Sequence, residues 1–91
     1  MNVLDELSTR LAALEPAQMD IADDSAKHAG HAGAGGGAHL RLTIVSPKFA
    51  GLGTMARHRL VYETAGDLMG GRIHALSITA RTPEEAGSAS L

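Results

Sequence analysis

The chain of 91 residues contains no cysteine and no tryptophan, and only one phenylalanine and one tyrosine. Without cysteine it supplies no disulfide, no thiol nucleophile and no thiolate ligand for a metal. With so few aromatic residues, its core must be built mainly from aliphatic side chains and methionine. A chain of this length is expected to form one domain.

Neither sign of charge is in excess, because the formal net charge is −2 at pH 7. There is therefore no general attraction to nucleic acid or anionic lipid, and any basic surface must be local. No stretch approaches the roughly 20 apolar residues that cross a bilayer. The first residues include Asp5 and Glu6 and lack an unbroken apolar run, unlike a signal or transit peptide. These absences predict a soluble cytoplasmic protein that does not enter a membrane.

The N-terminal segment has the apolar spacing of an amphipathic helix. Asn2 is expected to cap this helix and Pro16 to stop it. Strands are predicted over 17–24, 39–45 and 72–80, where apolar and polar residues alternate. The residues expected to face the core from the helix and the second strand are Val3, Leu4, Leu7, Leu11, Leu14, Leu40, Leu42 and Ile44.

Helical structure is also predicted between the second and third strands. Ser46 caps a short first piece, and Thr54 caps a longer piece that ends at Gly70 and Gly71. The longer piece carries on one face Val61, Ala65, Leu68 and Met69. Residues 1–85 are expected to form the domain, and residues 86–91 a polar, disordered tail.

This order of elements, α-β-β-α-(α)-β, predicts an α/β (α+β) domain with a three-stranded mixed sheet and helices on one face. The first two strands are joined by a loop and should run antiparallel. The second and third are joined by a helical crossover of about 26 residues, which permits parallel pairing through a right-handed connection.

Three histidines lie in the glycine-rich stretch HAGHAGAGGGAHL, residues 28–40. If the second and third strands are parallel, His39 and His74 lie at the same end of the sheet, beside the loop that carries His28 and His31. Neutral imidazole binds Zn, Cu, Fe and Ni. In the alternative interpretation, His74 shares the parity of Leu76 and lies at the rim of the core, His39 is a solvated strand residue, and the loop histidines are incidental.

A basic patch follows the glycine-containing segment GLGT. Its candidate contacts to a nucleic-acid backbone are Gly51, Gly53, Arg57, His58, Arg59 and Lys48. No aromatic residue in the patch supports base stacking. The alternative is a solvated helix face with arginines paired to Glu63 or Asp67.

The sequence does not favour an enzyme. No serine lies on a recognisable nucleophile elbow. Asp23 and Asp24 are adjacent near a strand end, so they point to opposite faces and do not form a carboxylate pair.

Several blocks, in this order, make the chain similar to the BolA family. They are HAGHAG, HLRLTIVSPKF, FAG, RHRLVY and IHALSITARTPEE, which together extend through most of the chain. The resemblance implies a class II KH-like fold. It also implies a heterodimer with a monothiol, CGFS-type glutaredoxin, in which a [2Fe–2S] cluster is shared.

The resemblance also implies the ligands of that cluster. His74, in the IHAL block, matches the family's invariant ligand. The second ligand comes from the loop between the first two strands, where His31 is the best match and His28 and His39 are alternatives. The glutaredoxin and glutathione would supply thiolates. The isolated chain need not hold the cluster, and is expected to be a monomer or a weak homodimer.

Three functions therefore remain open. The first is a non-enzymatic accessory protein in iron–sulfur cluster trafficking or iron and redox sensing. The second, which the family's link with transcription regulation and stress response also implies, is a DNA-binding regulator that uses the KH-like surface. The third is a protein whose histidines bind a single Zn or Cu ion.

Overall fold

The computed structural model describes residues 2–24 and 38–89 of the chain. The helices and strands are, in order, α1 (Val3–Leu11), β1 (Gln18–Asp23), β2 (Ala38–Val45), α2 (Thr54–Ala65), β3 (Ile73–Arg81) and α3 (Pro83–Ala89). Short 3-10 turns cover Ala12–Leu14, Pro47–Phe49 and Gly66–Leu68. The predicted order of elements is confirmed as far as β3.

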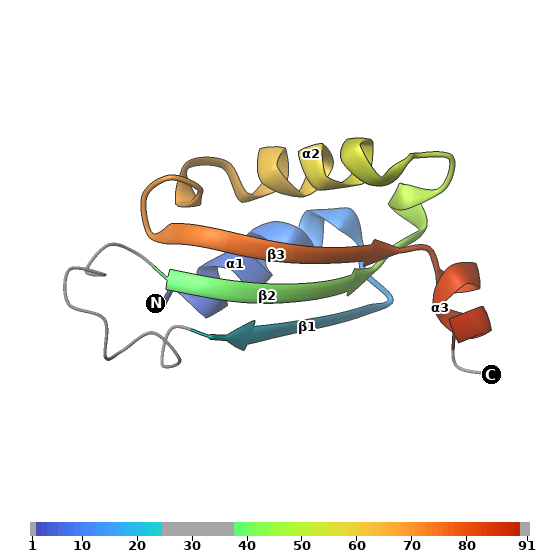
Figure 1. Ribbon diagram of the computed structural model, residues 1–91, viewed down its shortest axis with the longest axis horizontal. Helices are drawn as coiled ribbons and strands as arrows, with labels where there is room; N and C mark the ends of the chain where they lie inside the picture. Colours follow the sequence, from blue (N-terminus) through green and yellow to red (C-terminus); the bar gives the residue numbers. More distant parts are fainter. Residues whose placement is uncertain (1, 25–37, 90–91) are drawn as a thin grey trace.

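The three strands form one sheet in the order β1-β2-β3. β1 pairs with β2 antiparallel, and β2 pairs with β3 parallel. The predicted mixed sheet is therefore confirmed. Because β2 and β3 are parallel, their first residues lie at the same end of the sheet, on the left in Figure 1.

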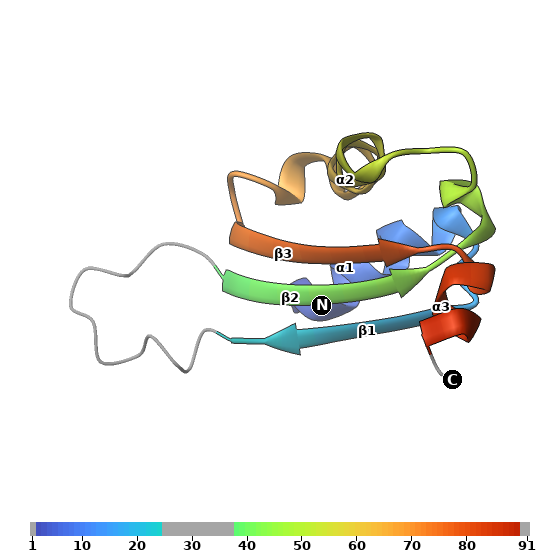
Figure 2. The same ribbon diagram turned by 45° about the vertical axis from the view of Figure 1, so that its right-hand side comes forward.

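Both longer helices pack on one face of the sheet, as expected. In Figures 1 and 2, α1 lies behind the strands and α2 lies above β3, and Figure 2 shows α2 nearly end-on. Their apolar side chains and those of β2 and β3 form one core. Its buried members are Leu7, Leu11, Leu14, Leu40, Leu42, Ile44, Phe49, Val61, Ala65, Leu68, Ile73 and Leu76. The alternation predicted for β2 is confirmed, because every second side chain enters this core.

Two capping residues identified in the sequence hold the first helix and the turn after β2. The Asn2 Oδ1 atom accepts a hydrogen bond of 2.9 Å from the Asp5 N–H. The buried Ser46 hydroxyl donates to the Leu14 carbonyl at 2.5 Å and accepts from the Lys48 N–H at 3.0 Å. Ser46 therefore joins the end of the N-terminal helical segment to the turn that leads towards α2.

The bounds of α2 differ from those expected. Gly53, not Thr54, is the N-cap residue, and Thr54 is the first residue of the helix. The helix ends at Ala65, and its C-cap residue is Gly66, where φ is 62°, not Gly70 or Gly71. The 3-10 turn that follows still directs Leu68 into the core, which is why the apolar spacing resembles one longer helix.

The C-terminal segment forms the short helix α3. Its first turn is a capping box, in which the Glu85 N–H donates to Thr82 Oγ1 at 3.2 Å and the Thr82 N–H donates to Glu85 Oε1 at 2.8 Å. The sequence predicted a polar tail from residue 86, whereas the helix continues to Ala89. None of the helices within the described residues has the length and hydrophobicity of a membrane span.

Candidate functional site

A β-bulge shapes the end of the sheet at which β2 and β3 begin. Ala38 lies opposite Ile73, but the next residue of β2, His39, lies opposite Ala75. One step along β2 therefore corresponds to two steps along β3, and His74 is the additional residue. A bulge of this kind bends the strand locally and changes the direction of a side chain.

The bulge determines the side of the sheet on which His74 lies. Ile73 and Leu76 are both buried, while His74 and Ala75 between them are exposed. The interpretation that His74 lies at the rim of the core, on the parity of Leu76, is therefore wrong. That parity assumes an unbroken strand, and the additional residue shifts it.

The predicted approach of two histidines is confirmed. The imidazole rings of His39 and His74 lie with their centroids 5.1 Å apart and their planes inclined by 43°. His39 is half-buried, on the parity opposite to the buried Leu40, so it faces away from the helices. Two imidazoles from neighbouring parallel strands therefore lie side by side on the outward surface.

The ends of the neighbouring strands support this pair. The Asp24 N–H donates to the His39 carbonyl at 2.8 Å, and Arg41 forms an ion pair with Asp24 at 3.3 Å. On β3, the Gly70 N–H donates to the Ile73 carbonyl at 3.2 Å. These contacts hold the backbone on both sides of the bulge.

Imidazole nitrogens of this kind bind borderline metals such as iron, zinc and copper. Within residues 2–24 and 38–89, no group of three or more His, Asp or Glu side chains is arranged to hold a metal ion. This end of the sheet thus offers two imidazoles from the described residues and would leave further coordination positions to other ligands. His28 and His31 lie outside the described residues. The donor set fits a metal centre completed by another molecule.

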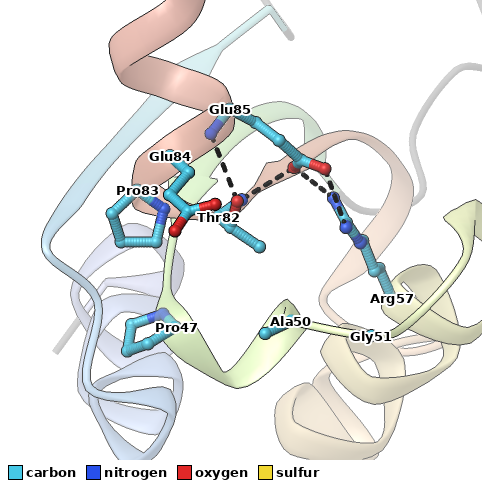
Figure 3. A pocket seen from close by; sticks show the side chains of 8 residues that line it. All are labelled: Pro47, Ala50, Gly51, Arg57, Thr82, Pro83, Glu84 and Glu85. Carbon is cyan, nitrogen blue, oxygen red and sulfur yellow. Dashed lines mark hydrogen bonds and ion pairs between the residues drawn. The ribbon is translucent and has the colours of Figure 1, made fainter.

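The basic patch is organised around an arginine that is already bound, as Figure 3 shows. The Arg57 guanidinium donates to both carboxylate oxygens of Glu85, at 2.6 and 3.0 Å. It also donates to the backbone carbonyls of Leu52 at 2.8 Å and Ala80 at 3.0 Å. Its side chain is only 13% exposed. Arg57 therefore fastens α3 and the end of β3 to the glycine-containing turn before α2.

This contact also changes the acidity of Glu85. The hydrogen bond from Arg57, supported by the Thr82 N–H, lowers the pKa of Glu85 from 4.5 to about 2. Its carboxylate therefore stays charged throughout the physiological range. The pocket beneath it, about 460 Å³ in volume, is lined by Pro47, Ala50, Gly51, Arg57, Thr82, Pro83, Glu84 and Glu85.

The six predicted nucleic-acid contacts do not form one surface. Gly51 and Arg57 line the pocket beside α3, while His58 and Arg59 line a separate hollow on the outer side of α2. Lys48 forms an ion pair with Glu15 at 3.2 Å. Gly51 has a φ of 79°, a conformation that favours glycine, whereas Gly53 is simply the cap of α2.

Two expectations about the patch are corrected. Arg57 pairs with Glu85, not with Glu63 or Asp67, and Asp67 instead pairs with Arg10 at 2.6 Å. The hollow lined by Arg59 also contains the aromatic ring of Tyr62, so the outer side of α2 does not lack an aromatic residue. The helical spacing from 59 to 62 was a signal for this neighbour.

Thr82 and Glu85 are structural residues that the sequence interpretation missed. The segment Thr-Pro-Glu-Glu has the spacing of a capping box with proline at the first helical position. That signal predicts a helix start, and therefore a carboxylate held near the end of β3. The identity of its partner, Arg57, follows only from the tertiary structure.

Comparisons with known proteins agree on one family. A family model described as "BolA-like protein" matches residues 11–85. Protein BOLA1, chloroplastic, of Arabidopsis thaliana is 43% identical over 79 residues, which cover 82% of this chain and 49% of that protein. SufE-like protein 1, chloroplastic/mitochondrial, of the same plant is 42% identical over 78 residues, which cover 79% of this chain and 21% of that protein. The chain thus spans about half or less of the length of these relatives.

The fold agrees with the sequence comparison. The solved structure of BolA1 from Arabidopsis thaliana matches with a TM-score of 0.80 and 35% sequence identity, covering 93% of this chain and 96% of that one.

Proposed function

This chain belongs to the BolA-like protein family, and we propose that it is a non-enzymatic accessory protein that binds a monothiol glutaredoxin. In the complex, two of its histidines co-ligate a [2Fe–2S] cluster that both proteins share. The role of such a complex is iron–sulfur cluster trafficking or iron and redox sensing.

One observation carries the proposal. The imidazoles of His39 and His74 lie side by side, with centroids 5.1 Å apart, on the outward surface of the sheet. The bulge is what turns His74 outward, and the segment that carries His28 and His31 is joined directly to the first residue of β2. His74 and the half-buried His39 thus lie where a second protein can reach them, as ligands shared across an interface must.

The composition of the chain sets how the ligands are divided. Protein ligands at four positions hold a [2Fe–2S] cluster, and two histidines replace two cysteines on one iron in Rieske centres. This chain has no cysteine, so its contribution is imidazole. The thiolates come from the glutaredoxin and from glutathione.

His74 is proposed as one ligand, and the second is a histidine from the other side of the bulge. His31 is the candidate from the family pattern, and His39 is the neighbour within the described residues. Bound there, the cluster supplies iron and sulfide for transfer and an electron-accepting centre.

The test mixes the purified chain with a cluster-loaded monothiol glutaredoxin and records visible circular dichroism. The wild-type chain should change the spectrum, and His74→Ala should remove the change. Parallel variants His28→Ala, His31→Ala and His39→Ala identify the second ligand. His58→Ala is the matched control, because His58 lies on α2 and lines the hollow there. A spectrum that His74→Ala leaves intact would refute the assignment.

DNA binding remains the alternative function, with less support from the structure. Arg57 is bound to Glu85 and two carbonyls, and Lys48 is paired with Glu15. A duplex affinity that falls steeply with salt, and weakens in Arg59→Ala, would support it. No binding above background at low salt would exclude it.

The single-ion alternative is separated by metal analysis. Chain purified without the glutaredoxin should contain no stoichiometric zinc or copper if the shared cluster is the correct proposal. One equivalent of either ion, lost in His39→Ala and His74→Ala, would favour the single-ion function.

A further inference from the structure

The outer side of α2 carries two large apolar side chains that are exposed. Met55 is 79% exposed and Tyr62 is 42% exposed, and these are the exposed large hydrophobic residues of the described chain. By contrast Phe49, the other aromatic residue, is fully buried. Isolated exposed apolar residues are ordinary, but these two lie seven positions apart on one helix and so share a face.

The same side of the helix has the composition of a protein interface. Met55, Arg59 and Tyr62, with His58 beside them, line a shallow hollow of about 290 Å³. Tyrosine, methionine and arginine are the residue types enriched at the centres of protein–protein interfaces. The outer face of α2 therefore offers an anchor for a partner, and its charges indicate which partner fits.

The charged residues on this face can pair with those of a second copy of the same face. Arg59 and Glu63 are both exposed and stand one turn apart. Among the ion pairs of the described residues, neither of them takes part in one. In a two-fold interface a residue i that contacts j in the partner is matched by j contacting i. Two antiparallel copies of α2 would thus bring each Arg59 to a Glu63.

We propose that the outer face of α2 is an interface between two copies of this chain. The two α2 helices lie antiparallel, with Arg59 of each copy paired to Glu63 of the other. Tyr62 of each copy lies near the two-fold axis, and Met55 covers the ends of the contact. A helix of 12 residues is about 18 Å long, so the interface is small and the dimer is weak and transient.

A second copy fits this face better than nucleic acid. Glu63 stands one helical turn from Arg59, and the chain as a whole carries a net charge of −2. The Glu63 carboxylate and the net negative charge repel a phosphate backbone. In the two-fold contact, by contrast, Arg59 and Glu63 are both paired. The interface does not cover the pair formed by His39 and His74, because His39 faces away from the helix layer. The inference therefore goes beyond the proposed function and does not depend on it.

Sedimentation equilibrium of the purified chain, from about 10 µM to 1 mM, tests the proposal. We expect a reversible monomer–dimer equilibrium. Arg59→Glu and Glu63→Arg should each weaken dimerisation at least about fivefold, because the symmetry counts each lost ion pair twice. The exchanged variant, Arg59→Glu with Glu63→Arg, restores opposite charges and should recover the wild-type affinity.

Two further variants complete the design. Tyr62→Ser should weaken the dimer by removing the central contact from both copies, while Asp20→Arg, a charge reversal on β1, should leave it unchanged. Circular dichroism shows that each variant is folded. A chain that remains monomeric at 1 mM, or an exchanged variant that stays as weak as the single reversals, would overturn the proposal.

Discussion

The buried hydroxyl of Ser46 gives the structure its most quantitative test. Ser46 is the one buried polar residue among the described residues, and it has no exposed surface. Its hydroxyl makes two hydrogen bonds. Ser46→Ala removes the donor to the Leu14 carbonyl, which lies in a buried setting and costs about 1–3 kcal/mol when left unpaired. It also removes the cap of the turn Pro47–Phe49, which contributes about 1 kcal/mol. The expected loss is about 3 kcal/mol.

Urea denaturation followed by far-ultraviolet circular dichroism measures this loss. With a urea slope of about 1–3 kcal/mol per molar, typical of small domains, the midpoint should fall by about 1–3 M. Ser77→Ala is the matched control, because Ser77 is exposed on β3, and its change should stay within about 0.5 kcal/mol. If Ser46→Ala costs no more than Ser77→Ala, the hydroxyl does not join the two segments in the way described.

Two further predictions concern the end of the sheet near α3. Because the folded pKa of Glu85, about 2, lies below its ordinary value of 4.5, its ion pair with Arg57 contributes stability above pH 4.5 that is lost as the pH falls towards 2. Glu85→Gln should therefore lower the urea midpoint at pH 7, and the difference in midpoint from the wild type should shrink between pH 4.5 and 2. A difference that stays constant over this range would contradict a stabilising ion pair between Glu85 and Arg57. Gly51→Ala should lower the free energy of unfolding by about 1–2 kcal/mol, because φ is 79° at this position. Gly87→Ala should not destabilise the chain, because a Cβ atom there meets open space. Equal urea midpoints for the two variants would contradict the backbone argument.

The sheet was predictable because its signals are local. Successive side chains of a strand point to opposite faces of the sheet. The alternation of apolar and polar residues along β2 therefore identifies Leu40, Leu42 and Ile44 as core residues. The long connection after β2 permits parallel pairing, and parallel pairing places the two strand starts together. These two facts place His39 and His74 at one end of the sheet, and the bulge then brings both imidazoles to the same side.

The features that the sequence did not predict depend on contacts between distant segments. The bulge at His74 is a shift in pairing between two strands, and no residue type in β3 announces it. Gly66, Gly70 and Gly71 are all acceptable helix ends by sequence, and packing of the following turn selects the first. The partner of Arg57 lies 28 positions along the chain, on a helix that was not expected.

The additional residue at the start of β3 has a consequence for how this protein tolerates change. The extra length is absorbed in one step of pairing, and from His39 opposite Ala75 to Val45 opposite Arg81 the two strands pair residue for residue. Insertions or deletions confined to this position would re-aim an imidazole while the hydrophobic interior keeps its arrangement. The direction of the His74 side chain and the packing of the core can therefore vary separately at this one place in the chain.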